Sequence, residues 1–573
     1  MTEVHAPSES TLRKPFGAST CLITFSPRRT PVFHFDVLVL GAGVAGSIAA
    51  LSGANRRSNV ALIAKGGLGE SNTNYAQGGL AAAMGLDDSL RAHAADTLEV
   101  GCGLSDARVV EKVTADGPAA VRRLIQLGAS FDRTASGELV LSREGGHSYA
   151  RILHAQGDAT GQEIQRALSA AVVHHPGISV FEHTFVIDLL RSESGCVVGA
   201  LAMTEHGELV SFSAGQVILA TGGSGQIFRE TTNPVIATGD GVAMALRAGA
   251  EVRDMEFMQF HPTCLYIAGA ARVLISEIVR GAGGVLRDKH GRRFMPDYHD
   301  KAELAPRDVV SRAVFSVMVS TNDTSVYLDL SELETDPHAL FPGISRICRF
   351  FGIDIAKDPV PVRPGAHYQV GGIAVDLDGR TSVPGLWAVG ECASSGLHGA
   401  NRMGSNSLLE GVVLGDLCGA AAAGSVHRPE APAWLAVQPL EPVRPPVGIH
   451  VNIEDMIYSL KSLMWRQMGV ERNQAGLADA LAKISFWARA MGGLGLANRR
   501  ALELINMLTV ARLAAEGAMA REESRGVHYR TDFKHVDPRR SEHTLITPIV
   551  KGHRIEELVL SRVPVVGEHR LGR

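Results

Sequence analysis

The feature that most constrains this chain is a buried strand that runs directly into a glycine-rich turn and then into a helix. Residues 37–40 are apolar without alternation, which is typical of a strand buried on both faces. The turn Gly41-Ala-Gly43-Val-Ala-Gly46 follows, and the Ala-rich stretch 44–55 favours a helix. In such a unit the glycines permit a tight turn and close approach by a pyrophosphate, and the helix N-terminus attracts negative charge. The pattern predicts a nucleotide-binding domain, although the glycine motif alone is weak evidence.

The end of the next predicted strand, residues 59–65, bears on which nucleotide is bound. A dinucleotide-binding unit usually carries an Asp or Glu there, which accepts a hydrogen bond from a ribose hydroxyl. Here the residue is Lys65, which disfavours NAD and leaves a flavin dinucleotide open. A solvated strand end is the alternative reading of Lys65.

Composition excludes several classes of protein. The chain has 573 residues, enough for two to four domains, and its formal charge of −4 provides no basic field for nucleic acid. The seven cysteines are scattered and form no CxxC pair, so we expect free thiols in the cytoplasm and no metal site. Residues 1–34 are too polar for a signal peptide or a membrane helix, and we expect a disordered extension there.

Several elements follow from local patterns along the chain. Helices are expected from about Ser89 and over 105–127, with Gly128 just past the second, and 179–219 is expected to form a β-meander. Two further strand–glycine units lie at 216–225 and 381–391, and the segment between them is rich in His, Arg and Pro. The apolar run 411–424 is expected to be a core helix. Residues 453–464 show helical periodicity after a Pro-rich linker at 429–446.

These elements predict an α/β fold in which a nucleotide-binding domain is interrupted by an inserted domain and followed by a C-terminal helical bundle.

Four polar clusters indicate chemistry. His261 precedes a proline, which favours an extended turn, and Arg307 follows a proline at a predicted helix start. His367 lies just before two glycines, and Arg402 lies in a loop rich in Gly, Asn and Ser that leads into a helix from about residue 407. Each cluster alone could be structural. Two arginines and two histidines together favour a small substrate with more than one carboxylate, because guanidinium binds carboxylate in a bidentate manner.

The ordered set of motifs resembles the succinate dehydrogenase and fumarate reductase flavoprotein family from about Phe35 to Phe533. The matching motifs are GAGVAG, NTNYAQGG, ATGG, HPT, RFMPDYHDKAELAPRDVVSR, HYQVGG, VGE, HGANRMGSNSLLEG and ESRGVHYRTDF. By motif position, the resemblance implies FAD contacts from Gly41, Ala42, Gly43, Gly46, Lys65, Asn72, Thr73, Gln77, Gly78, Gly79, Asp240, Glu391, Ser407 and Leu408. It likewise implies a dicarboxylate site with His261, His367, Arg307, Arg402 and Glu144 as catalytic residues and Gln259, Ser276 and Ser405 as further substrate contacts. In that site Arg402, His261 and His367 would fix the two carboxylates, and Arg307 would lie close to the reacting carbons. Many relatives carry Thr where this chain has Ser276.

The resemblance also implies a Rossmann-like FAD-binding domain that is split by an inserted α+β capping domain and followed by a C-terminal helical bundle. The implied parts are an extension at 1–34, the first part of the FAD-binding domain at 35–254, the capping domain at 255–368, the second part of the FAD-binding domain at 369–438, the helical domain at 439–535 and a tail at 536–573.

Two positions separate the branches of that family. Asn72 stands where membrane-bound succinate dehydrogenases carry the histidine that bonds the flavin, so we expect non-covalent FAD. Glu144, in the segment REGGHS, is shared with members that oxidise L-aspartate and is missing from the succinate enzymes. A carboxylate beside a dicarboxylate site favours a substrate with an ammonium group.

The resemblance therefore implies oxidation of L-aspartate to iminoaspartate, the first step of de novo NAD synthesis, with O2 or fumarate as electron acceptor and quinolinate synthase as a candidate partner. Two alternatives stay open. One is an electron-transfer subunit that oxidises succinate and docks on an iron–sulfur partner, and the other is a nicotinamide-dependent dehydrogenase, which Lys65 disfavours.

Overall fold

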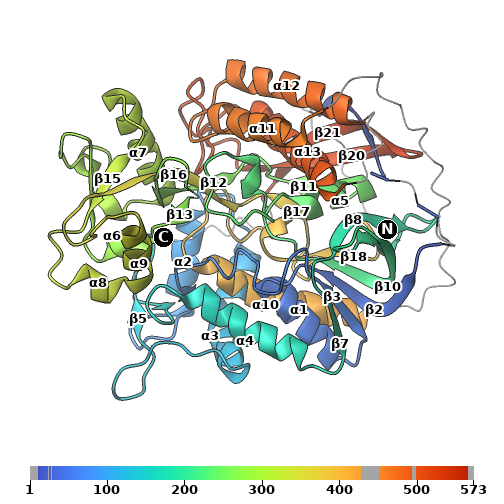
Figure 1. Cartoon of the computed structure of the whole chain (residues 1–573), viewed down its shortest axis with the longest axis horizontal. Coiled ribbons are helices and arrows are strands. Elements are labelled where there is room, and N and C mark those ends of the chain that lie inside the picture. Colours follow the sequence, from blue (N-terminus) through green and yellow to red (C-terminus); the bar gives the residue numbers. More distant parts are fainter. Residues whose placement is uncertain are drawn as a thin grey trace.

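The computed structural model describes residues 11–565 except 24, 27–28, 271, 427–450 and 493–497. The predicted Pro-rich linker lies outside the described residues. Figure 1 shows a twisted sheet with its helices at the lower right, a second sheet with short helices at the left, and a layer of helices across the top.

The predicted strand–turn–helix unit is confirmed and lies at the centre of the first sheet. β2 (Val32–Leu40) lies between β3 (Val60–Ile63) and β10 (Leu209–Leu219), and both pairings are parallel. β7 (Ile178–Phe181) pairs with β3, and β18 (Leu386–Ala388) pairs with β10, both in parallel. β9 (Val197–Met203) pairs with β10 and β8 (Phe185–Arg191) pairs with β9, both antiparallel. The expected meander is correct only for β8, β9 and β10, since β7 returns to pair with β3 at the opposite edge.

Two glycine-rich helices pack against each other beneath this sheet. α1 (Val44–Asn55) and α10 (Asn406–Gly424) approach closely because Gly411, Gly415 and Gly419 form a stripe on α10. A Cβ atom on Gly419 would lie 2.2 Å from the carbonyl oxygen of Ala49, so only glycine fits there. Within the described part of the chain, α10 is the one helix long and apolar enough to cross a membrane, and its apolar window is mostly buried. It is the core helix that the sequence predicts.

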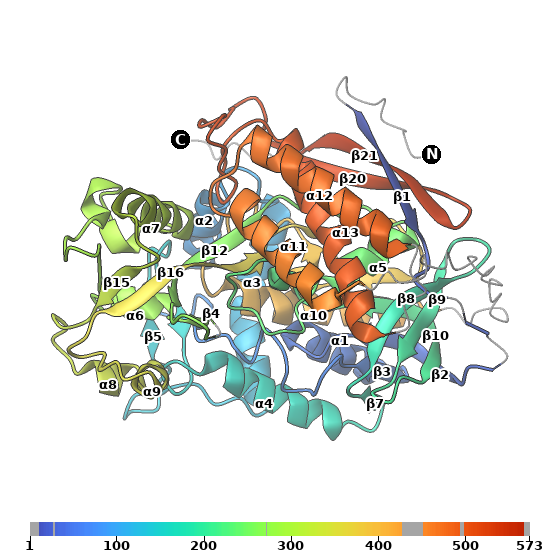
Figure 2. The same ribbon diagram turned by 45° about the horizontal axis from the view of Figure 1, so that its top comes forward.

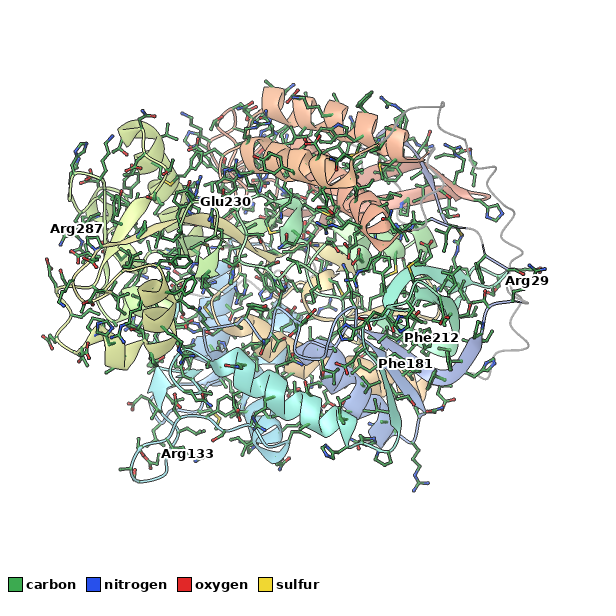
Figure 3. All side chains as sticks on the ribbon, in the orientation of Figure 1. Arg29, Arg133, Phe181, Phe212, Glu230 and Arg287 are labelled. Carbon is green, nitrogen blue, oxygen red and sulfur yellow. The ribbon has the colours of Figure 1, made fainter. Side chains whose placement is uncertain are left out.

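Other helices cover the same domain. They are α2 (Leu90–Val100), α3 (Ala107–Gln126), α4 (Thr160–Val173) and α5 (Asp240–Ala248), with short strands β4 (Leu80–Ala81), β5 (Leu141–Ser142) and β6 (Ile152–Leu153) and the 3-10 turns η1 (Gly225–Ile227) and η4 (Gly390–Cys392). The predicted starts of α2 and α3 are confirmed, because Ser89 and Asp106 accept hydrogen bonds from the first turns. Figure 3 shows Phe181 and Phe212 close together at the sheet, with ring centroids 4.9 Å apart.

The inserted segment has a sheet and an apolar core of its own. Its strands are β12 (Met258–Leu265), β13 (Val273–Leu274), β14 (Val285–Arg287), β15 (Val326–Asp329) and β16 (Val360–Gln369). Its helices are α6 (Glu277–Gly281), α7 (Arg307–Thr321), α8 (Pro337–Leu340) and α9 (Pro342–Phe350), with 3-10 turns η2 (Met295–Asp297) and η3 (Ala302–Leu304). Because β12 and β16 run from this sheet toward the first domain, they carry side chains to the junction between the two (Figure 2).

The C-terminal helices form the layer seen at the top of Figure 1. They are α11 (Ile453–Gln467), α12 (Gln474–Gly492) and α13 (Arg499–Ala520). The predicted apolar face of α11 is confirmed, since Ile457, Leu460, Leu463 and Met464 are buried. α13 packs on α5 and links this layer to the first domain.

The expectation of a disordered N-terminal extension is wrong for residues 12–19. These form β1 (Leu12–Ser19), which pairs with β21 (Arg554–Pro564) in a sheet that continues through β20 (Glu542–Lys551), β11 (Val252–Arg253), β17 (Gly372–Ala374) and β19 (Ala393–Ser394). Figure 2 shows β1 alongside the C-terminal hairpin. The strand is ordered by a partner from the far end of the chain, which no local pattern reveals.

Candidate active site

A long cavity lies between the first domain and the inserted one, at the carboxyl ends of β2, β3, β10 and β18. This is where open parallel sheets bind their ligands. It brings together most of the predicted residues from distant segments. The predicted FAD contacts on its wall are Gly41, Ala42, Gly43, Lys65, Asn72, Thr73, Gln77, Gly78, Gly79, Asp240, Glu391, Ser407 and Leu408, and the predicted substrate-site residues are His261, Ser276, Arg307, His367, Arg402 and Ser405. Gly46, Glu144 and Gln259 lie behind the wall.

The glycine turn has the geometry that its sequence predicts. Gly41 has a φ of +113°, and a Cβ atom there would lie 2.1 Å from the carbonyl oxygen of Ala220 on β10. A Cβ atom on Gly46 would lie 1.9 Å from the carbonyl oxygen of Gly41, so Gly46 allows α1 to start directly against the turn. Thr73, in the loop after β3, contacts the start of α1, because its Oγ1 accepts a 3.0 Å hydrogen bond from the backbone N–H of Val44.

Lys65 is held inside the protein rather than solvated. Its ammonium group donates to Asp240 Oδ2 and Thr238 Oγ1 at 2.7 Å each and lies 2.9 Å from a carboxylate oxygen of Glu503 on α13. Asp240 also accepts a 2.7 Å hydrogen bond from Asn506. The two carboxylates neutralise the lysine, and together these residues connect the cavity wall to the helical layer.

Several polar atoms of the wall have no protein partner. They are buried and belong to Asn72 (Oδ1), Gln77 (Oε1), Thr221 (Oγ1) and Ser407 (Oγ). Buried polar groups are nearly always hydrogen-bonded, so unpartnered ones around one cavity indicate a polar ligand. Together with the close-approach glycines and the helix start at Val44, they fit a dinucleotide such as FAD.

Asn72 and Glu391 form a pair across the cavity. The Asn72 amide donates a 2.7 Å hydrogen bond to Glu391 Oε2, and the backbone N–H of Gln369 donates to Glu391 Oε1. Burial raises the pKa of Glu391 to about 7, although both hydrogen bonds oppose that change. The position that holds a flavin-linking histidine in the succinate enzymes thus carries an amide already engaged by a carboxyl group.

In the predicted dicarboxylate site, Gln259 positions two arginines. Its Oε1 accepts hydrogen bonds from Arg307 and Arg402, each at 3.4 Å, and its Nε2 donates to the carbonyl of Arg402 at 2.8 Å. Its polar atoms are thus bonded to the protein, and its predicted contact with substrate stays a prediction. The guanidinium of Arg402 also lies over the ring of Tyr368, 4.6 Å from its centroid.

The two arginines differ in electrostatic environment. Arg307 begins α7 directly after Pro306, as predicted, and its Nε donates a 2.7 Å hydrogen bond to Glu277 Oε2. Arg402 has no carboxylate partner in the described part of the chain, and burial together with Arg307 lowers its pKa to about 10. Arg402 therefore remains charged at neutral pH and provides an uncompensated positive charge.

His261 and His367 are neutral hydrogen-bonding groups. Their ring centroids lie 5.1 Å apart, and burial, with the nearby arginines, holds the pKa of each well below its usual value. The backbone N–H of Thr263 donates to Nδ1 of His261 at 3.3 Å, which leaves the proton on Nε2, an atom with no protein partner. Thr232 Oγ1 lies 2.9 Å from Nδ1 of His367. His261 lies within strand β12 at a register shift, and not in the predicted extended turn.

Glu277 and Arg280 belong to the site although the sequence did not single them out. Burial opposes ionisation of Glu277, but the charges of Arg307 and Arg280 outweigh it and lower its pKa. Arg280 lies 3.8 Å from Glu277 and is completely buried. The only local signal was their spacing of three residues at a helix start, next to Ser276, whose hydroxyl caps that helix.

Glu144 lies directly behind the wall. Its Oε2 accepts a 2.7 Å hydrogen bond from Ser405, whose side chain lines the cavity, and its Oε1 is buried without a partner. A Cβ atom on Gly404 would lie 2.9 Å from Glu144 Oε2 and 3.0 Å from Arg307, so both charges converge on this glycine. Glu144 does not pair with Arg143, whose Nε donates to the carbonyl of His147.

Comparison with family models matches the two parts of the chain to flavoprotein domains. Residues 36–408 match an FAD binding domain, and residues 458–568 match the fumarate reductase flavoprotein C-terminal domain. The first match covers more than half of the chain, and FAD is the cofactor that this domain binds.

Curated relatives include an L-aspartate oxidase of Nostoc sp., 41% identical over 90% of this chain and 93% of the relative, and one of Streptomyces coelicolor, 43% identical over 87% and 88%. Among solved structures, a variant FrdA chain of E. coli quinol fumarate reductase aligns with a TM-score of 0.85 at 33% identity and covers 95% of this chain and 99% of that one. Sdh1 of Mycobacterium smegmatis aligns at 0.80 and 33%, covering 93% and 95%. The chain belongs to the L-aspartate oxidases, FAD-dependent oxidoreductases within the succinate dehydrogenase and fumarate reductase flavoprotein family.

Proposed function

We propose that this protein oxidises L-aspartate to iminoaspartate as the first step of de novo NAD biosynthesis. The observation that carries the proposal is a buried carboxylate, Glu144, placed against a site whose other charges and donors suit a dicarboxylate. A site for succinate alone would gain nothing from that carboxylate, since it would repel the substrate.

The two carboxylates of the substrate are held by Arg402, His261 and His367. Arg402 supplies the uncompensated positive charge, and His261 supplies a neutral N–H donor from Nε2. Charge-assisted hydrogen bonds of this kind are short and directional, so they fix the Cα–H bond relative to the cofactor. Fixing that orientation is the main contribution of the protein to the rate.

The charge of Glu144 favours the α-ammonium group. Oxidation removes a hydride from Cα and a proton from the nitrogen, which leaves iminoaspartate. Bound FAD supplies the hydride acceptor. Ser405 holds Glu144 with a 2.7 Å hydrogen bond, so the negative charge stays beside Gly404, on which Arg307 also converges.

Arg307 balances the charge close to the reacting carbons. Its Nε is held by Glu277 and its Nη1 donates to Gln259, while the side chain lines the cavity. When fumarate is the acceptor, a guanidinium in this position stabilises the negative charge that develops on fumarate as it accepts a hydride. These contacts support the different roles that the resemblance implies: Arg402 anchors a carboxylate, and Arg307 acts at the site of reaction.

We further propose that FAD is bound non-covalently, because Asn72 has no nucleophilic nitrogen and its amide is engaged by Glu391. We propose O2 and fumarate as the electron acceptors, the second on the strength of the fumarate reductase relatives. The free state of all seven cysteines supports a cytoplasmic location. Transfer of iminoaspartate to quinolinate synthase completes the proposal.

The direct test is to incubate the purified, FAD-loaded protein with L-aspartate in air and to measure hydrogen peroxide and oxaloacetate, the hydrolysis product of iminoaspartate. We expect stoichiometric formation of both without NAD or any partner protein. Succinate under the same conditions is the matched control. Turnover of succinate alone, or a requirement for an iron–sulfur partner, would refute the proposal in favour of an electron-transfer subunit.

A further inference from the structure

A second cavity lies on the outer side of the helical layer, apart from the FAD-binding cavity. It is formed by α11, α12 and the loop that follows η1, and Figures 1 and 2 show the two helices side by side at the surface. Its volume is about 370 Å³, which falls within the range of small-molecule sites, roughly 300–1000 Å³. None of its lining residues takes part in the proposed reaction.

Aromatic rings form two walls of this cavity. Tyr458 and Trp465 are seven residues apart on α11 and therefore lie on one face, and Trp487 faces them from α12. Trp465 and Trp487 are only partly buried, although both pack on the main apolar core. Partly exposed tryptophans on opposite walls offer stacking surfaces to a flat ring.

The cavity carries a surplus of positive charge. Arg229, Arg466 and Lys483 line it. Lys483 is paired with Asp479 at 2.7 Å, whereas Arg466 has no carboxylate partner among the residues that the structure describes. The surplus favours an anionic ligand.

The carboxylate nearest to Arg229 belongs to Glu230, which also contacts two other arginines. Glu230, labelled in Figure 3 where the inserted sheet meets the helical layer, accepts from Arg272 and lies 3.6 Å from Arg229 and 3.9 Å from Arg363. One carboxylate thus balances three guanidinium groups. Arg229 therefore retains most of its capacity to bind an anion.

One residue of the cavity wall has a polar atom without a protein partner. Ser462 lines it from α11, and its Oγ is buried with no hydrogen-bond partner in the protein. We propose that this cavity binds a small aromatic anion, with its ring against Trp465 and Trp487 and its acid group on Arg229 and Arg466. A mononucleotide and a benzene dicarboxylate share this chemistry.

The cavity is connected to the substrate site by a chain of hydrogen bonds. The backbone N–H of Arg229 donates to the carbonyl of Lys461 on α11, and the ammonium of Lys461 donates to Gln226 at 2.6 Å. Gln226 donates to the carbonyl of Asn233, whose amide donates to the carbonyl of His367 at 2.8 Å. A ligand that moves Arg229 or α11 therefore shifts the segment that holds His367. This regulatory consequence rests on the proposed function, whereas the binding itself does not.

Binding is tested by calorimetric titration of the FAD-loaded protein with AMP and, separately, with phthalate. Adenosine and ribose 5-phosphate, each lacking one half of the proposed ligand, are the comparators. We expect AMP to bind at least tenfold more tightly than either. Arg466→Gln and Trp487→Leu should each weaken AMP at least tenfold, while Arg489→Gln, an exposed arginine of α12 outside the cavity, leaves it unchanged.

Absence of binding by both AMP and phthalate at ~1 mM, the limit of weak specific affinity, would overturn the proposal. So would equal binding of ribose 5-phosphate, or AMP affinity that neither variant alters. For the regulatory part, saturating AMP should change the KM for aspartate at least twofold in the wild type and not in Arg466→Gln. An unchanged KM would refute that part. Failure of the proposed function would show separately, as absence of aspartate turnover without AMP.

Discussion

Glu144→Gln isolates the charge that distinguishes an amino-acid substrate from a plain dicarboxylate. Glutamine keeps the size of the side chain and an acceptor for the Ser405 hydroxyl, which holds Glu144 Oε2 at 2.7 Å. The substitution removes a negative charge that is 4% exposed and therefore poorly screened by water. Fumarate has no ammonium group and does not require that charge.

The expected magnitude follows from the burial and the partners of Glu144. Because Glu144 lies behind the wall, its charge acts on the ammonium group through space, and two unit charges ~4 Å apart interact by at most ~4 kcal/mol at an effective dielectric constant of ~20, less at greater separation. We therefore expect kcat/KM for aspartate to fall roughly tenfold to 150-fold. Fumarate reduction should stay level or improve, because a repelling carboxylate has gone.

The assay compares kcat/KM for aspartate oxidation and fumarate reduction in the same preparations, with FAD content checked by absorbance. Ser405→Ala is the matched control, since it removes the hydroxyl partner of Glu144 but keeps the charge, and it should retain the preference for aspartate. Equal losses on both substrates in Glu144→Gln, or no loss on either, would refute the assignment of Glu144 to the ammonium group.

Three further predictions concern other groups of the site. Arg402→Leu should lower both aspartate oxidation and fumarate reduction at least tenfold while the protein stays yellow, because it removes the uncompensated charge that anchors a carboxylate; near-normal turnover of either substrate would exclude Arg402 from the site. Acid precipitation should leave the yellow colour in the supernatant, and a yellow pellet would show a covalent flavin. Since burial raises the pKa of Glu391 from 4.5 to about 7, its carboxyl is easier to ionise in the unfolded chain, and Glu391 should destabilise the fold increasingly as pH rises between those values. In thermal melts of the FAD-free protein, the Tm of Glu391→Gln relative to wild type should therefore rise from pH 5 to pH 7.5, and a difference independent of pH would contradict this.

Local rules predicted the elements whose determinants are close in sequence. The bounds of α1 match the predicted helix because the preceding glycines and the buried strand lie next to it. The start of α3 was likewise visible in its capping residue, Asp106. β1 was missed because its pairing partner β21 lies at the other end of the chain, and the segment itself contains Pro15 and two cations. Its order is a property of the whole fold.

The sequence predicted which residues line the cavity better than it predicted how they are arranged. Most of the residues named from the order of the motifs lie on the cavity wall, but the motifs could not show which of them face one another. Gln259 and Glu144 were expected to contact substrate, and both lie one layer behind the wall, where they position Arg402 and Ser405. Glu277 was missed because its importance depends on Arg307, which lies thirty residues further along the chain.

The fold supplies a physical basis for the different roles that the family resemblance implies for the two arginines. As residue types alone, Arg307 and Arg402 are equivalent candidate carboxylate ligands. The structure gives Arg307 a carboxylate partner at 2.7 Å and leaves Arg402 with an aromatic ring and a glutamine. A compensated guanidinium attracts a distant anion weakly, whereas an uncompensated one in the same low-dielectric cavity attracts it strongly. Under the proposed function, initial capture of the substrate therefore falls to Arg402. Arg307, whose charge is partly balanced by the Glu277 carboxylate that it shares with Arg280, remains near the reacting carbons without holding the product.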